Sequence, residues 1–279
     1  MSGIRVVTDS SCDLPASALA ENGIVVVQLD VRLGELGPDV MRDLTPVEFW
    51  AKCAASSSLP ETSAPSPGAF RDVFAAAADE GCPGVVCVTI SSALSGTYQA
   101  ATTGAEELGD RIPIEVIDSR SVTMGQGLLA LLAGRLASEG QDTAAVAAAV
   151  RAAIDKIKVY GSLDTLENLR RGGRIGAAQA LLGSLLSIKP VIEVRDGVVE
   201  AESRQRTRTR ALQYLVDKVR DAGEIVQLAI LHSMAADVDV FAGMLADIFP
   251  RDKTIIGTIG PVVGTHAGPG AVGVAYQLA

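Results

Sequence analysis

The chain has 279 residues, of which 48% are hydrophobic and 20% are charged, and its formal net charge is −9 at pH 7. These values are typical of a globular protein with one large or two medium domains. The acidic balance argues against general nucleic-acid binding, and no apolar run approaches the roughly 20 residues that a membrane-spanning helix needs, so we expect no stable membrane insertion.

The first half of the chain alternates β-branched runs with alanine-rich amphipathic stretches. The runs predict strands at residues 4–9, 24–33, 84–90 and 112–118, and the stretches predict helices near 14–22, 45–57, 68–80, 97–108 and 124–155. Near-continuous apolar strands separated by helices indicate a parallel sheet covered on both faces. We therefore expect an α/β domain over residues 1–157, with three layers in the order α/β/α.

The second half has a different pattern. It begins with a strand at 158–164, followed by a hairpin at 187–203 whose turn is Asp196–Gly197. A helix at 206–223, a strand at 225–232, a helix at 234–249 and a strand at 254–260 follow. This order predicts an α+β domain with a mixed sheet over residues 158–279.

The segment SSALSGTYQ follows the predicted strand 84–90. Ligands bind beyond the carboxyl ends of strands in parallel sheets, and Ser95 and Gly96 stand where a helix begins. Free N–H groups at a helix N-terminus attract anions, so Ser92, Ser95 and Gly96 are candidates to bind one. The alternative is that Ser95 only caps the helix.

Two further candidates come from segments with constrained backbones. Thr62 precedes Pro65 and Pro67, which hold the chain extended, although this stretch is also consistent with an ordinary proline-rich connection. His266 lies in a glycine-rich segment, GTHAGPG, which we expect to be a loop just past a strand. A histidine in such a loop is placed to meet a ligand, and its charge can respond near neutral pH.

The segment LENLRRGGRIG at 166–176 gathers cationic side chains in an acidic protein. Its arginines are Arg170, Arg171 and Arg174, and SRQRTRTR supplies Arg204, Arg206, Arg208 and Arg210. Two arginine groups in one domain suggest a docking surface for an acidic partner or for a phosphate that the partner carries. The alternative is two unrelated solvated faces.

Taken together, these stretches resemble the DegV family of fatty-acid-binding proteins, which present acyl chains to a bacterial fatty acid kinase. The matching pieces run in family order over essentially the whole chain: VTDSSCDLP (7–15), LDVRLG (29–34), LTPVEFW (44–50), TSAPSP (62–67), ISSALSGTYQ (90–99), VIDSRSVTMGQG (116–127), LDTLENLRRGGRIG (163–176), LLGSLLSIKPVIEVRDGVV (181–199), RTRTRAL (206–212) and GPVVGTHAGPGAVGVAY (260–276). Many family members have glutamine in place of Ala64.

The resemblance implies a two-domain fold with an apolar tunnel for one long-chain fatty acid. It implies that a hydroxyl and histidine network holds the carboxylate, with Thr62, Ser95, Ser92, Gly96 and His266 as the matching residues. The partner kinase then transfers phosphate from ATP to that carboxylate, as part of phospholipid metabolism. The resemblance also assigns the docking of the kinase to Arg170, Arg171, Arg174 and Arg206.

The resulting expectation is a monomeric lipid carrier without catalysis of its own and without a cofactor beyond the bound fatty acid. The two histidines lack metal-ligand spacing, so no metal is expected. The start of the chain shows no signal peptide and the four cysteines have no C-x-x-C spacing, which favours a cytoplasmic protein with reduced thiols.

Two other functions stay open. Ser95 as nucleophile and His266 as base would make a lipase or thioesterase, although the G-x-S-x-G motif is absent. The DegV fold also resembles one domain of dihydroxyacetone kinases, so a sugar- or ketone-kinase-like subunit is a further alternative, on fold analogy alone.

Overall fold

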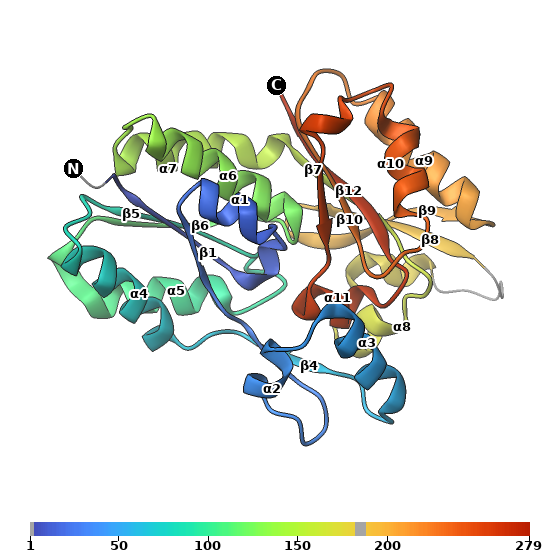
Figure 1. The fold of residues 1–279 in the computed structure, drawn as a ribbon, viewed down its shortest axis with the longest axis horizontal. Coiled ribbons are helices and arrows are strands. Elements are labelled where there is room, and N and C mark those ends of the chain that lie inside the picture. The colour runs from blue at the N-terminus through green and yellow to red at the C-terminus, as the bar shows by residue number, and fades with distance from the viewer. Residues whose placement is uncertain (1–2, 182–187) are drawn as a thin grey trace. The chain divides into compact units, whose positions relative to one another are not determined.

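The structure, a computed structural model, describes residues 3–181 and 188–279 (Figure 1). Residues 182–187 of the matching piece 181–199, and with them the first residue of the predicted hairpin, lie outside the described residues. The chain forms two compact units: unit 1 comprises Met1–Asp30 and Ser63–Asp155, and unit 2 comprises Val31–Thr62 and Lys156–Ala279.

Unit 1 is built on a four-stranded parallel sheet in the order β2-β1-β5-β6. Its strands are β1 (Arg5–Asp9), β2 (Ile24–Val27), β5 (Val85–Thr89) and β6 (Ile114–Asp118). Its helices are α1 (Ala16–Glu21), α4 (Pro67–Asp79), α5 (Thr97–Leu108), α6 (Met124–Ser138) and α7 (Thr143–Ala153). Helices α4 and α5 cover one face of the sheet and α6 and α7 the other, which confirms the predicted α/β/α layers (Figure 1).

Two predicted elements of the first half are each divided in the structure. The predicted strand 24–33 ends at Val27, and the chain then forms β3 (Asp30–Arg32), which pairs with β4 (Glu61–Ser63) in a separate two-stranded sheet. The predicted helix 124–155 is α6 and α7, because Gly140 adopts a φ of 84° and ends the first helix.

A glycine lies where helices α4 and α5 contact each other. Phe70 and Phe74 of α4 are fully buried against the sheet, and Ala100 and Ala101 of α5 belong to the same buried cluster. A Cβ at Gly104 would lie 2.5 Å from the carbonyl oxygen of Pro67. Only glycine therefore permits this approach of the two helix backbones.

Unit 2 is built on a six-stranded mixed sheet in the order β11-β10-β12-β7-β8-β9. Its strands are β7 (Ile157–Ser162), β8 (Lys189–Arg195), β9 (Val198–Gln205), β10 (Ile225–His232), β11 (Ile255–Thr258) and β12 (Val272–Leu278). Its helices are α2 (Pro38–Arg42), α3 (Pro46–Ala55), α8 (Glu167–Arg171), α9 (Arg208–Arg220), α10 (Val238–Leu245) and α11 (Pro261–Ala267). Strand β10 is parallel to β11 and antiparallel to β12, which confirms the predicted mixed sheet.

The turn between β8 and β9 and the place of β12 in the sheet both follow from residue type. Asp196 and Gly197 have φ values of 53° and 84°, so they form the tight turn that the Asp-Gly pair predicts. The sequence analysis expected a loop at GTHAGPG, where the structure has the end of α11, and it gave no element for β12. Strand β12 is apolar and buried because it lies in the interior of the sheet, between β10 and β7.

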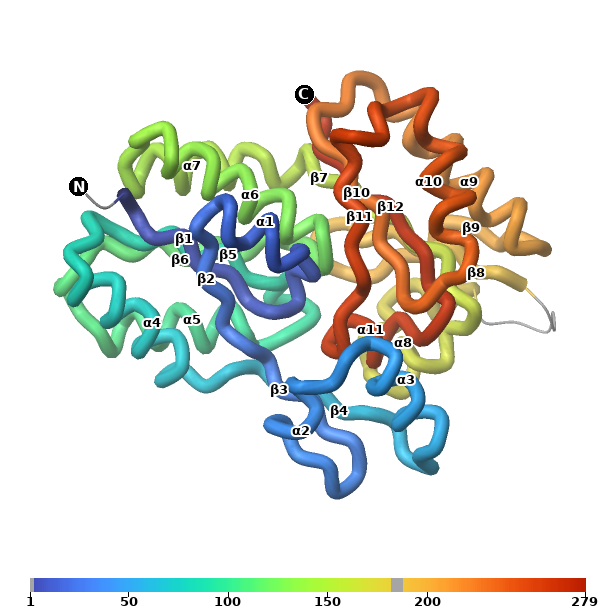
Figure 2. Tube along the Cα trace, viewed as in Figure 1, coloured from blue at the N-terminus to red at the C-terminus, as the bar shows by residue number. Residues whose placement is uncertain are grey.

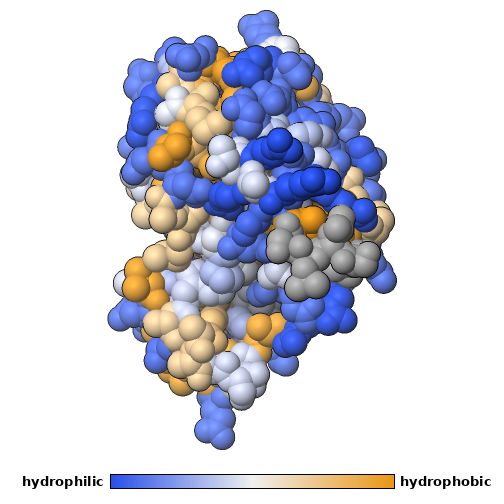
Figure 3. Space-filling model, turned by 90° about the vertical axis from the view of Figure 1, so that its right-hand side faces the viewer, coloured by the Kyte–Doolittle hydropathy of each residue, from blue (hydrophilic) through white to orange (hydrophobic). Residues whose placement is uncertain are grey.

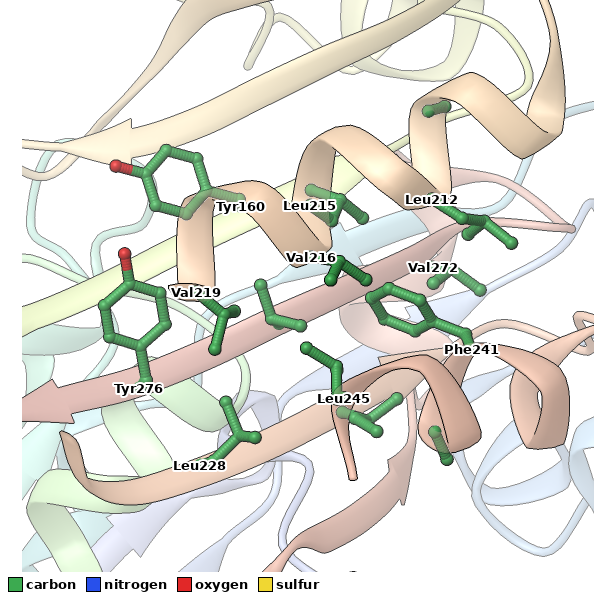
Figure 4. Packing of buried hydrophobic residues seen from close by; sticks show 14 of the residues in the cluster. Tyr160, Leu212, Leu215, Val216, Val219, Leu228, Phe241, Leu245, Val272 and Tyr276 are labelled. Atoms are coloured by element: carbon green, nitrogen blue, oxygen red, sulfur yellow. The ribbon is translucent and has the colours of Figure 1, made fainter. Parts of the chain in front are cut away.

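The core of unit 2 lies between this sheet and helices α9 and α10 (Figure 4). Leu215 and Val219 of α9 and Phe241 of α10 are fully buried against strand residues such as Val272. The period of the apolar positions in α9 puts them on one face of the helix. This packing holds the sheet in place, and with it the segments that leave its ends.

The predicted boundary between the domains was residues 157/158. The chain passes from unit 1 to unit 2 at Asp155/Lys156, and Val31–Thr62 also belongs to unit 2. This segment leaves after β2, forms β3, α2, α3 and β4, and returns to α4 (Figure 2). It belongs to unit 2 because α3 packs against α11: a Cβ at Gly264 would lie 3.2 Å from the ring of Trp50.

The same segment exposes several apolar side chains. Val40 of α2 and Val47 of α3 are 48% and 61% exposed. Figure 3 shows hydrophobic surface in the lower part of the molecule, at the height of α2 and α3 in Figure 1. Among the described residues no helix is both long and apolar enough to cross a membrane.

The close packing of α4 and α5 yields a first prediction. We expect Gly104→Ala to lower the free energy of unfolding by about 1–3 kcal/mol, because the new methyl group would press on the backbone of α4. Gly68→Ala in α4 is the control, since its methyl group would meet nothing closer than 3.7 Å. Urea unfolding measures both; equal stability of the two variants would contradict the argument.

Candidate functional site

The candidate site in unit 2 is organised around α11. Pro261 occupies the first turn of this helix, and Gly268, with a φ of 79°, ends it. Helix α8 packs beside α11, where Asn168 Nδ2 donates a hydrogen bond of 3.0 Å to the carbonyl oxygen of Thr265. His266 is thus in the last turn of a short helix. The prediction that it lies in a glycine-rich loop was wrong, because the glycines flank α11.

Thr62 and His266 form the central contact of the site. Thr62 lies in β4, which pairs with β3, and its Oγ1 is 3.0 Å from Nε2 of His266, within hydrogen-bonding distance. The two residues are 204 positions apart in the sequence. They come together because the segment 31–62 packs on α11. Both side chains are half-buried, so the contact faces a partly protected space.

A glycine that the sequence analysis did not single out supports the imidazole ring. A Cβ at Gly172 would lie 2.7 Å from Cε1 of His266 and closer still to Nδ1. Gly172 has a helical φ of −74°, whereas its neighbour Gly173 has a φ of 69°. The two consecutive glycines therefore serve two purposes: Gly173 supplies the left-handed backbone conformation that ends α8, and Gly172 makes room for His266. A helix end needs only one glycine in the left-handed conformation. The second of the two consecutive glycines was therefore the sequence signal for a close contact at this position.

The imidazole is neutral at neutral pH. Burial lowers the pKa of His266 to about 4, and the nearby positive charge of Arg174 contributes in the same direction. Nδ1 of the ring is buried and has no hydrogen-bond partner in the structure. A neutral imidazole has one N–H and one lone pair, so the ring can hold a polar group without adding a positive charge.

A cavity of about 550 Å³ opens over this contact. It is lined by residues 57–61 and by Thr62, Asn168, Arg171, Gly172, Arg174, Thr265 and His266. All of these belong to unit 2. The cavity thus combines several hydroxyl groups, a neutral imidazole, two guanidinium groups and one carboxylate, that of Glu61. Its cations outnumber its anion, which suits an anionic ligand.

The structure separates the four arginines that were assigned to partner docking. Arg170 and Arg171 lie on α8 and pair with the same carboxylate, Glu167, whose pKa is lowered to about 2 by hydrogen bonds from both. Arg171 also lines the cavity, as does Arg174, whose Nη1 donates to the carbonyl oxygen of Gly172 at 2.7 Å. Arg206 is exposed in the turn before α9.

Ser95 and Gly96 belong to unit 1 and lie where α5 begins. The helix starts at Thr97, so Gly96 occupies the N-cap position that the sequence analysis considered for Ser95. Ser95 Oγ is 2.8 Å from Oγ1 of Thr97. Ala64, two residues beyond Thr62 in the chain, approaches Gly96: a Cβ there would lie 4.0 Å from that of Ala64. Whether Ser95 joins Thr62 and His266 in one network stays a prediction.

Ser92 is held by a carboxylate that was not foreseen. Its Oγ donates to Asp118 Oδ2 at 2.5 Å, and its backbone N–H donates to Oδ1 of the same residue. Asp9 similarly accepts from the backbone N–H of Ile90, at 2.8 Å. These carboxylates belong to the last residues of β6 and β1, so they connect the loops at the carboxyl ends of the parallel strands. The hydroxyl of Ser92 thus fixes the loop that carries Ser95.

Across the part of the chain that the structure describes, no three histidine, cysteine or acidic side chains gather as a metal site. The cysteines Cys12, Cys53, Cys82 and Cys87 are all free thiols.

Comparison with known proteins agrees with this fold. The architecture defines the class: a two-unit α/β protein with a parallel sheet in one unit and a mixed sheet in the other. The sequence profile of the DegV family matches residues 3–278, and the chain belongs to this family. DegV domain-containing proteins of Streptomyces coelicolor and Mycobacterium tuberculosis are 36% and 38% identical to it; the alignments cover 97% and 99% of this chain, and 97% of each relative.

Solved structures of the same family are similar over the full length. A DegV family protein from Thermus thermophilus, described by its fatty acid binding, has a TM-score of 0.88 and 35% identity and covers 99% of this chain and 100% of its own. DegV from Bacillus subtilis, described as a fatty acid binding protein, has a TM-score of 0.86 and 26% identity, with full coverage of both chains. The resemblance found in the sequence is confirmed.

The support of His266 by Gly172 can be tested without a ligand. In Gly172→Ala the added methyl group must displace the imidazole, so we expect the pKa of His266 to rise towards 6.5 as the ring leaves its buried position. The chain has only two histidines, and NMR titration of their ring signals measures the change. Gly243→Ala in α10, where a Cβ meets nothing within 4 Å, is the control. An unchanged titration of His266 in Gly172→Ala would contradict the close contact.

Proposed function

We propose that this protein binds one long-chain fatty acid in an apolar tunnel and presents its carboxylate to a partner ATP-dependent fatty acid kinase. The observation that carries the proposal is the contact between Thr62 and the neutral imidazole of His266 at a cavity suited to an anion. Family members described as fatty acid binding share the fold over its full length. Their ligand class is the reason to assign the anion as a fatty acid carboxylate.

The head group fits donors without a full positive charge in direct contact. In the tautomer we assign, Nε2–H of His266 donates to Thr62 Oγ1, which leaves the Thr62 hydroxyl proton for the ligand. We assign the remaining donors to Ser95 and the backbone N–H groups at the start of α5. Consecutive Cα atoms are about 3.8 Å apart, so Thr62 lies within about 7 Å of Ala64, which approaches Gly96. Chain connectivity thus favours one head-group network.

Burial of the acyl chain supplies the affinity in this proposal. Each buried methylene contributes about 0.8 kcal/mol, so about fourteen methylenes contribute about 11 kcal/mol before the costs of association. A buried carboxylate without partners would cost several kcal/mol, which the hydroxyl and backbone N–H donors offset. Because these donors are neutral, the carboxylate stays available for phosphoryl transfer.

The same geometry favours a carrier over an enzyme. Nδ1 is the ring nitrogen of His266 that does not contact Thr62, and it has no carboxylate partner. His266 therefore lacks the third group that orients a catalytic histidine. A pKa near 4 also makes His266 a weak general base at neutral pH. We therefore propose a cytoplasmic, monomeric carrier without a cofactor, whose bound fatty acid becomes an acyl phosphate for phospholipid metabolism only when the kinase docks.

The proposal is tested by native mass spectrometry of the purified protein, followed by solvent extraction. We expect an excess mass of one fatty acid, recovered as the free acid in the extract. In Thr62→Val the affinity for hexadecanoic acid should fall about tenfold, or about 1.4 kcal/mol, because the carboxylate loses a hydroxyl donor.

Thr258→Val is the control for this variant, because Thr258 is exposed on β11, away from the cavity. It should bind hexadecanoic acid as the native chain does. A protein that neither retains nor takes up lipid would overturn the proposal. Turnover of a chromogenic ester that Ser95→Ala abolishes would instead favour the lipase or thioesterase alternative.

The docking assignment gives a separate expectation. Arg170 and Arg206 are exposed, and neither lines the cavity, so Arg170→Glu and Arg206→Glu should weaken binding to the kinase at least tenfold while the affinity for fatty acid stays within twofold. Arg251→Glu, another exposed arginine of unit 2, is the control. Surface plasmon resonance with the immobilised kinase measures the first quantity. Unchanged kinase binding in both variants would remove these arginines from the interface.

A further inference from the structure

The outer edge of the sheet in unit 1 borders a groove that the proposed function does not use. Strand β6 is last in the order β2-β1-β5-β6, so no strand among the described residues pairs with its outer side. A cavity of about 540 Å³ lies along this strand, and its lining residues belong to β6, to α5 and to the turns between them. We call this cavity the edge groove. All of its lining residues belong to unit 1, whereas the cavity over Thr62 and His266 belongs to unit 2.

The backbone of β6 directs polar groups towards the edge groove. The carbonyl oxygen of Pro113, just before the strand, accepts a hydrogen bond of 2.9 Å from the N–H of Val85 in β5, and the N–H of Ser119, just after it, donates one of 3.1 Å to a carbonyl oxygen of β5. In a parallel pair, alternate residues of a strand bond to the same neighbour, so the odd-numbered residues of β6 face β5. The N–H and C=O groups of Ile114 and Val116 therefore face outward. These are also the two residues of β6 that line the groove.

The side chains of the edge groove are apolar along the strand and acidic at the rim. Ile114 and Val116 are half-buried and pack on the same apolar cluster as Ala105 of α5. Glu106 and Asp110 line the groove and are exposed, and none of the described residues that line it is a lysine or an arginine. An apolar strip with two carboxylates and no cation is complementary to a segment that carries apolar and basic side chains.

We propose that the outer edge of β6 binds an extended segment of a partner protein, in which apolar residues alternate along the strand and lysine or arginine stands at the ends. Such a segment adds a fifth strand to the sheet. Its main-chain hydrogen bonds to Ile114 and Val116 give affinity, and its alternate side chains fill the groove. A second copy of this chain fits less well, because pairing through its own β6 would bring Glu115 and Asp118 to a groove that is already acidic. The inference goes beyond the proposed function, since it assigns a surface of unit 1 to a protein partner.

The test uses two fluorescein-labelled peptides with blocked ends, KVTVTVK and EVTVTVE, and measures binding by fluorescence anisotropy. We expect the native chain to bind KVTVTVK at least tenfold more tightly than EVTVTVE. Glu106→Gln and Asp110→Asn should each weaken binding of KVTVTVK at least threefold. Glu107→Gln is the matched control, because Glu107 is the next residue of α5 and is also exposed, but lies outside the groove.

A proline substitution tests the backbone pairing. In Val116→Pro the outward N–H is lost while the bonds between β6 and β5 remain, so the chain should fold and bind KVTVTVK at least tenfold more weakly. Val116→Ala is its control, since it shortens the side chain but keeps the N–H, and it should weaken binding less. Circular dichroism checks that each variant is folded. In the native chain, which needs no variant, KVTVTVK should slow amide hydrogen exchange at Ile114 and Val116.

The outcomes separate this proposal from its alternatives. A native chain that binds neither peptide, or both equally, would overturn it, as would unchanged hydrogen exchange at Ile114 and Val116. A native dimer in light scattering that Val116→Pro converts to a monomer would show that a second copy occupies the edge, and would also overturn it. Binding of hexadecanoic acid should stay within twofold in all these variants, so failure of the edge groove leaves the proposed function intact.

Discussion

The site depends on one hydrogen bond, that between Thr62 and His266. Each of the two residues depends on other elements for its position in this bond. His266 must be placed in the last turn of α11, where the ring fits only because residue 172 has no Cβ, and Thr62 must be brought to it by a segment of more than thirty residues that leaves and re-enters unit 1. The bond therefore links the packing of α8, α11 and α3 to the chemistry of the cavity.

The electrostatic properties of the site follow from this packing. Burial of the imidazole against α8 disfavours its protonated form, and the positive charge of Arg174 acts in the same direction. The arginine thus has two effects: it keeps His266 neutral and it gives the cavity a cation beside that neutral group. A protonated histidine in the same place would hold a carboxylate more tightly and make it a poorer nucleophile.

The positions of the arginines also explain why cationic side chains gather in the segment 166–176. Arg170 and Arg171 share one carboxylate, Glu167, which anchors both side chains on α8. Adjacent positions on a helix point in different directions, so only Arg171 reaches the cavity. One short helix thus presents a cation to the exterior and another to the cavity.

The sequence by itself determined much of this protein. Apolar runs and their spacing predicted the parallel sheet, and the Asp196–Gly197 pair predicted the hairpin, because these signals are local. The ordered motifs identified the family and pointed to Thr62 and His266. The sequence did not distinguish a loop from a helix around His266, since Pro261 and Gly268 are compatible with either.

Only the tertiary structure decided the rest. It placed β12 inside the sheet, joined Val31–Thr62 to unit 2 and brought Arg171 and Arg174 to the same cavity as His266. It also gave Gly172 its role. These are contacts between residues far apart in the chain, and they depend on how whole elements pack. A local sequence pattern does not specify which distant part of the chain will pack against it.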